Sequence, residues 1–134
     1  MQIGIINFFA FAELNGLKTV NDDQGHDAGD TLLKRAAALL KVAFNDDEIY
    51  RAGGDEFVIF SPDTSEDRFN EKIMQLRGLS DNTPDVRFAV GSIYCKGEYD
   101  IIRAMQQADE KMYKDKEEFY RLHPEKDRRK RSRG

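Results

Sequence analysis

"YRAGGDEFVIF", residues 50–60, predicts two short strands joined by a tight turn. The flanking segments "EIYRA" and "EFVIFS" contain Ile, Tyr, Phe and Val, whereas the turn between them contains Gly53 and Gly54. The same turn places two carboxylates, Asp55 and Glu56, side by side. Adjacent negative charges repel each other, so we expect water, a lysine or a metal ion beside them.

Further strands are expected on both sides of this hairpin. Residues 3–12 form an apolar run rich in Ile and Phe, which is typical of a central strand buried on both faces. Residues 86–95 read as the next strand, and Gly91 within it would allow close approach of another backbone. Cys95, the only cysteine, excludes an internal disulfide, fits a reducing compartment and is expected in the core.

Three helices are expected between and after these strands. Their apolar residues recur at helical spacing over residues 28–44, from near Ser65 to Leu76, and over residues 101–112. Asp30 is expected in the first turn of the first helix, and residues 21–30 and 79–85 are expected to be loops. The resulting order, β-α-β-β-α-β-α, predicts an α+β fold with one antiparallel or mixed sheet and helices packed on it.

Composition and charge limit the classes of function. The 134 residues are 40% hydrophobic and 34% charged, which indicates one soluble globular domain. The run "IGIINFFAFA" is too short to span a bilayer and lacks the basic start of a signal peptide. Residues 125–134 carry a net charge of +4 and residues 1–124 a net charge of −8. We interpret the basic tail as a solvated terminus rather than a nucleic-acid or membrane contact. The acidic body can still bind a polyphosphate if its carboxylates first collect divalent cations.

Three carboxylates are expected to meet at one end of the sheet. Glu13 closes the first strand, while Asp55 and Glu56 lie on the hairpin turn. Oxygen ligands of this kind suit Mg²⁺, and two such ions would allow phosphoryl or nucleotidyl transfer. The turn glycines would let the backbone approach a phosphate. The alternative is that Asp55 is an ordinary turn residue and Glu56 a solvated strand residue.

A second polar cluster lies in "ELNGLKTVNDDQGHDAGD", residues 13–30. The amide of Asn21 and the carboxylate of Asp30 match the N1–H and N2–H edge of guanine. Gly16 and neighbouring backbone N–H groups could meet phosphates. The alternative is that these residues only form turns and helix caps, and that His26 has no role.

The two clusters together resemble the GGDEF domain family, the diguanylate cyclases. Residues 53–57 read "GGDEF", and residues 13–33 match the family's first-strand and guanine-loop motif. "VRFAVGSIY", residues 86–94, and "ADEKMYKDK", residues 108–116, match its last strand and C-terminal helix. The resemblance runs from about residue 3 to about residue 121. It implies a domain over residues 1–122 without the family's usual N-terminal helix, followed by a basic tail over residues 123–134.

The resemblance implies a ferredoxin-like or palm-type fold that condenses two GTP molecules into cyclic di-GMP with release of pyrophosphate. It implies two Mg²⁺ or Mn²⁺ ions per site, an antiparallel homodimer with one GTP per domain, and an upstream sensor or regulatory domain. The domain would be cytoplasmic, by itself or as part of a membrane-bound sensor, with no nucleic-acid or membrane contact of its own.

Site residues follow from the resemblance position by position. Metal would be bound by Glu13, the Leu14 carbonyl, Asp55 and Glu56. Asp55 would help to activate the 3′-OH, and Glu56 would support the second ion. The substrate would be bound by Asn21, His26, Asp30, Gly16, Leu17, Lys18 and Lys116, with guanine read by Asn21 and Asp30 and phosphates contacted by Gly16, Leu17 and Lys116.

The chain departs from the family pattern at three positions. Glu13 stands where the family usually has Asp. The family's product-inhibition motif, Arg-x-x-Asp, falls on Phe44 and Asp47. Tyr120, followed by Arg121, stands where a phosphate-binding arginine is usual. These departures keep two other functions open: a degenerate domain that binds GTP without turnover, and a plain interaction domain.

Overall fold

The computed structural model describes residues 6–45, 47–83 and 85–126, so residues 3–5 of the expected first strand and 127–134 of the basic tail lie outside it. The elements are β1 (Ile6–Leu14), α1 (Leu17–Gln24), α2 (His26–Ala43), β2 (Glu48–Arg51), β3 (Glu56–Ser61), α3 (Glu66–Asp81), β4 (Phe88–Lys96), α4 (Ile101–Leu122) and the 3-10 helix η1 (Pro124–Lys126). Within the described part, no helix is long and apolar enough to cross a membrane.

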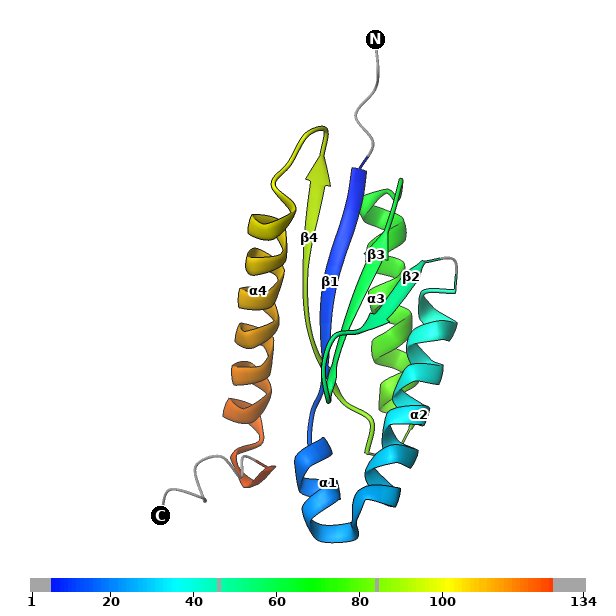
Figure 1. Cartoon of the computed structure of the whole chain (residues 1–134), viewed down its shortest axis with the longest axis vertical. Helices are drawn as coiled ribbons and strands as arrows, with labels where there is room; N and C mark the ends of the chain where they lie inside the picture. Colours follow the sequence, from blue (N-terminus) through cyan, green and yellow to red (C-terminus); the bar gives the residue numbers. More distant parts are fainter. Residues whose placement is uncertain (1–5, 46, 84, 127–134) are drawn as a thin grey trace.

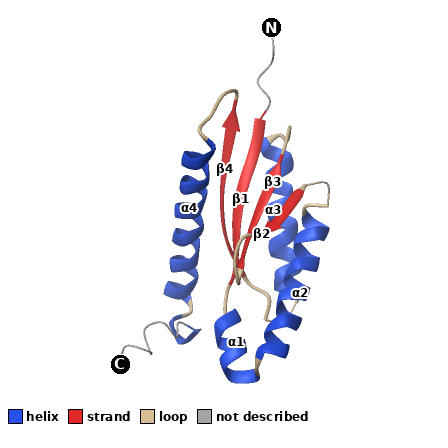
Figure 2. Ribbon diagram, in the orientation of Figure 1, coloured by secondary structure: helices blue, strands red, loops and turns tan. Residues whose placement is uncertain are grey.

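The described strands form one antiparallel sheet in the order β2-β3-β1-β4. Helix α4 covers one face of this sheet, and α2 and α3 cover the other (Figure 1). Figure 2 shows the strands as a single layer between these helices. The predicted α+β, ferredoxin-like fold is confirmed, and the sheet is antiparallel rather than mixed.

Strand β1 is central in the sheet because its side chains are apolar on both faces. Its even-numbered residues, such as Ala10 and Ala12, join the core under α2 and α3. Its odd-numbered Phe9 and Phe11 lie under α4, where Phe9 packs with Cys95. The predictions of a doubly buried central strand and of a core cysteine are both confirmed.

The prediction that residues 21–30 form a loop is wrong. Residues 17–24 form α1, and α2 begins at His26, directly after Gly25. Helix α1 forms because Leu17 is buried and Val20 packs against the core, which is the spacing of one apolar helix face. The polar turn formers occupy its other faces. Asp27, rather than Asp30, therefore lies in the first turn of α2.

Gly91 allows β4 and α4 to pack backbone to backbone. A Cβ atom at Gly91 would lie 2.1 Å from the Met112 backbone nitrogen and 2.2 Å from the Ala108 carbonyl oxygen. Neither backbone atom can move without shifting α4 away from the sheet. The predicted close approach at Gly91 is therefore confirmed.

Gly91→Ala is expected to lower the free energy of unfolding by about 2–3 kcal/mol, because the added methyl group overpacks a rigid contact. Urea denaturation of both proteins measures this change. Gly78→Ala is the matched control, since a Cβ at this α3 glycine meets no described atom within 4 Å. That variant should gain about 0.5–1 kcal/mol. Equal stability of Gly91→Ala and wild type would contradict the packing argument.

Candidate active site

The predicted carboxylates come together where β1 ends beside the turn between β2 and β3. Glu13 of β1 lies directly opposite Glu56 of β3 in the strand register. The backbone N–H of Leu14 donates to the Asp55 carbonyl at 2.7 Å, which fixes the turn to the end of β1. Helix α1 and the C-terminal half of α4 lie at this same end of the sheet (Figure 1).

Lys116 of α4 is the positive group beside these acids. Its Nζ forms an ion pair with Glu13 Oε1, and the two side chains are only 20% and 14% exposed. A pair this far from solvent is screened less than a surface ion pair. Lys116 therefore pairs with Glu13, and it is close enough to Glu56 to lower the pKa of that carboxyl. The same residue was predicted to contact phosphate.

The carboxylates carry more negative charge than Lys116 offsets. Burial raises the pKa of Glu56 above its usual value, and the nearby Asp109, Glu13 and Asp55 raise it further, while Lys116 lowers it. Asp109 was missed from the sequence. Its signal is its place two helical turns before Lys116, on the same face of α4.

Arg51 holds the turn in place. Its Nε donates to the Gly53 carbonyl at 3.1 Å and its Nη2 to the Gly54 carbonyl at 2.8 Å. A Cβ atom at Gly53 or Gly54 would meet no described atom within 4 Å. The fold itself therefore does not require either glycine, and the open space beside them leaves room for a bound group. Sequence analysis missed Arg51, although it directly precedes the turn.

The donor set fits a hard divalent cation in chemical type. Glu13, Asp55 and Glu56 supply carboxylate oxygens. The backbone N–H of Leu14 faces the turn, since it donates to the Asp55 carbonyl, and the Leu14 carbonyl remains a predicted metal ligand. Among the described residues, no group of three His, Cys, Asp or Glu side chains is placed to hold a metal ion. A metal ion would have to compete with Lys116 for Glu13.

The loop after β1 leaves polar groups available beside the acids. Gly16 begins α1 with a left-handed backbone, φ 82°, and no described side chain caps the helix there. The N–H groups of Leu17 and Lys18 therefore keep the anion-binding character of a helix start. The buried amide of Asn15 finds no partner among the described residues and could bind a water or ligand.

The predicted guanine-binding residues lie on two adjoining helices. Asn21 is half-buried on α1, while His26 and Asp30 are exposed on α2. The Asn21 side chain lies against Gly29, the residue before Asp30. The short corner between α1 and α2 thus carries all three residues.

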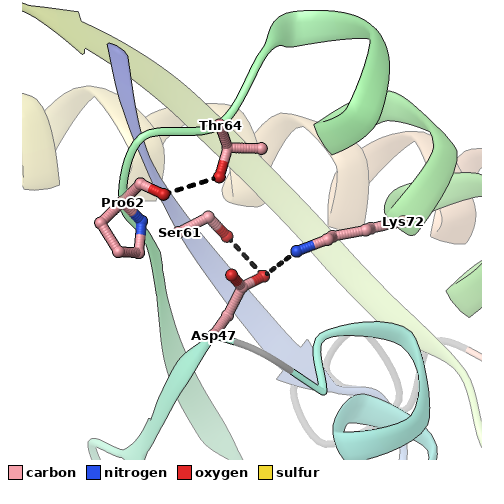
Figure 3. Close-up of polar contacts among 5 residues, drawn as sticks. All are labelled: Asp47, Ser61, Pro62, Thr64 and Lys72. Atoms are coloured by element: carbon pink, nitrogen blue, oxygen red, sulfur yellow. Dashed lines mark hydrogen bonds and ion pairs between the residues drawn. The ribbon is translucent and has the colours of Figure 1, made fainter. Parts of the chain in front are cut away.

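The residues at the family's inhibition motif are internal. Figure 3 shows that Asp47 Oδ2 accepts from Lys72 Nζ at 2.8 Å and from Ser61 Oγ at 2.7 Å; nearby, Thr64 Oγ1 donates to the Pro62 carbonyl. The Asp47 side chain is only 3% exposed, and Phe44 is fully buried. Both positions stabilise the packing of α3, so neither presents a free group to a ligand.

The end of α4 holds the last two predicted positions. The Arg121 guanidinium binds the Glu118 carboxylate one turn earlier, through both Nε and Nη2. Tyr120 is half-buried, with its ring packed edge-on against Phe119.

Known proteins share both the sequence pattern and the fold. Residues 7–120 match the family described as "Diguanylate cyclase, GGDEF domain". The chain is 36% identical over 118 residues to the signaling protein YkoW of Bacillus subtilis, covering 80% of this chain and 15% of YkoW. It is 28% identical over 111 residues to diguanylate cyclase DosC of Escherichia coli, covering 75% of this chain and 24% of DosC. The chain therefore spans a quarter or less of these curated relatives.

A solved structure extends the likeness to three dimensions. The GGDEF domain of DgcB from Caulobacter crescentus, crystallised in complex with c-di-GMP, superposes with a TM-score of 0.78. The two chains are 18% identical, and the match covers 84% of this chain and 73% of the other. This likeness shows a shared fold.

Proposed function

Because the chain belongs to the GGDEF domain family, we propose that it condenses two GTP molecules into cyclic di-GMP and releases two pyrophosphates. The observation that carries this proposal is that Glu13 lies opposite Glu56 and that the Asp55 turn is bonded to the end of β1, beside an uncapped helix start. Carboxylates next to N–H groups that no described side chain caps suit a triphosphate that arrives with divalent cations.

Each part of the site has a role in this reaction. The N–H groups at Gly16 and Leu17 bind phosphate oxygens, together with Lys18 and Lys116. Asn21 and Asp30 accept from the guanine edge, and His26 lines the substrate. Glu13, the Leu14 carbonyl, Asp55 and Glu56 would hold Mg²⁺ or Mn²⁺, which would supply positive charge for the phosphates. Asp55 accepts the proton of the 3′-OH as that oxygen attacks.

The reaction requires two copies of the domain. The 3′-OH of one GTP attacks the α-phosphate of the other, so one domain holding one GTP cannot form the cyclic product. We therefore propose an antiparallel homodimer as the active form. Since the chain spans a quarter or less of YkoW and DosC, we also propose that a regulatory domain controls this pairing in the full-length protein.

The Glu13–Lys116 ion pair favours a second function. A lysine that already neutralises Glu13 removes one carboxylate from the set that would hold the cations. A domain of this kind would bind GTP as a regulatory ligand without turning it over.

One experiment separates the two functions. The chain is incubated with GTP and either Mg²⁺ or Mn²⁺, and the mixture is analysed for cyclic di-GMP by chromatography, while GTP binding is titrated in parallel. Product formation supports the cyclase, and binding without product supports the regulatory domain. Failure to bind GTP in either metal would overturn both.

Glu13→Asp is expected to raise Mg²⁺-dependent turnover on the order of 10-fold, because the shorter carboxylate withdraws from Lys116 and small displacements strongly affect positioned catalysis. The gain should be smaller with Mn²⁺, since Mg²⁺ demands near-ideal octahedral geometry. Initial rates of product formation in both metals measure this. Glu98→Asp, the same change in an exposed loop, is the control. Lower turnover of Glu13→Asp in a domain shown to be active would mean that the longer acid is a compensated ligand.

A further inference from the structure

The absence of a side chain at Gly29 makes room for the amide of Asn21. A Cβ atom at Gly29 of α2 would lie 1.6 Å from Asn21 Oδ1 and 2.7 Å from Asn21 Cγ. Atoms cannot approach this closely, so any larger residue at position 29 must push the Asn21 amide elsewhere.

Neither backbone conformation nor helix stability accounts for this glycine. Gly29 lies within α2 and is not among the glycines with a left-handed backbone. A glycine inside a helix is less stable than alanine by about 1 kcal/mol. The contact with Asn21 is therefore the feature of the described structure that favours glycine here.

The corner between α1 and α2 brings the two residues together. Gly25, with φ 91°, reverses the chain direction between the helices. The Asn21 carbonyl accepts from Gly25 N–H at 2.9 Å, and the Gly25 carbonyl accepts from Gly29 N–H at 3.2 Å. Asp30 follows Gly29 directly, so the surface that receives the Asn21 amide is continuous with the second predicted guanine-reading group.

We propose that Gly29 is a positioning residue for nucleotide selectivity: its bare backbone holds the Asn21 amide in the orientation that reads guanine. This inference rests on the proposed function, in which Asn21 and Asp30 bind the guanine edge. Gly29 does not itself touch the nucleotide.

The structure also determines what Gly29→Ala does to the fold. The atoms that the new methyl group meets belong to the end of a side chain, which can rotate away, rather than to backbone. The variant should therefore be as stable as wild type or more stable, because alanine is the better helix former. A loss of selectivity in this variant cannot then be attributed to unfolding.

The test is a calorimetric titration with the α,β-methylene analogues of GTP and ATP in the presence of Mg²⁺. We expect the preference for the GTP analogue to fall about 10-fold in Gly29→Ala, the size of one lost hydrogen-bonding group. Gly78→Ala, a helical glycine with open space around it, should keep the wild-type preference. Thermal unfolding of each variant checks that the fold is unchanged.

A double-mutant cycle ties the effect to Asn21. If Gly29 acts through Asn21, adding Gly29→Ala to Asn21→Ala should change the preference no further. Undiminished preference in Gly29→Ala, or an equal further loss in the Asn21→Ala background, would overturn the inference while leaving the proposed function intact. Equal affinity of wild type for both analogues would instead overturn guanine reading itself, and the inference with it.

Discussion

Asp55→Ala is expected to lower the rate of cyclic di-GMP formation by about a thousandfold or more. Bound cations stabilise a phosphoryl transition state by several kcal/mol, and roughly 4 kcal/mol corresponds to a thousandfold in rate. In the proposed mechanism, removing Asp55 removes a ligand for those cations and the base beside the 3′-OH. Initial rates with saturating GTP and Mg²⁺ measure the change in a wild-type domain shown to be active.

The fold should survive this substitution. The turn is held by the Asp55 carbonyl, which accepts from Leu14 N–H, and by Arg51, which binds the Gly53 and Gly54 carbonyls. None of these contacts uses the Asp55 side chain. Glu98→Ala removes a carboxylate at the opposite end of the sheet and should leave the rate unchanged. A rate within tenfold of wild type for a folded Asp55→Ala would remove Asp55 from the mechanism.

The parts of the fold that the sequence predicts are those with a clear local pattern. The alternating and continuous apolar runs identify the strands, and the glycine-rich turn identifies the hairpin. Helix α1 escapes prediction because its core contact consists of Leu17 and Val20 alone, amid residues typical of turns. Its helical structure depends on packing against the core rather than on its own propensity.

The acids of the candidate site can be recognised in the sequence, but the residues that contact them in the folded chain cannot. Glu13 and Lys116 are separated by 103 positions, and only the packing of α4 on the sheet brings them together. The same holds for Asn21 and Gly29, which look like two ordinary turn residues until α2 folds back on α1. Charge balance and side-chain orientation depend on tertiary contacts, so they cannot be predicted from a short sequence motif.

Asp47→Ala is expected to lower the free energy of unfolding by about 3–5 kcal/mol, because it leaves the ammonium of Lys72 buried without a counter-charge. The Lys72 side chain is 10% exposed and bonds to Asp47 at 2.8 Å. Ser61 loses its partner as well. Urea denaturation monitored by circular dichroism measures the loss, provided that the transition stays two-state.

The double variant Asp47→Ala/Lys72→Met shows whether the lost stability comes from an unpaired buried charge or from the loss of packing contacts. Replacing both members of a buried ion pair by apolar groups is often close to neutral, so this variant should recover most of the lost stability. If it is as unstable as Asp47→Ala alone, packing rather than charge explains the effect. Recovery would establish that Asp47 serves the α3 packing. Because the Asp47 carboxylate is already paired with Lys72 and Ser61, we expect no tight cyclic di-GMP binding at this position.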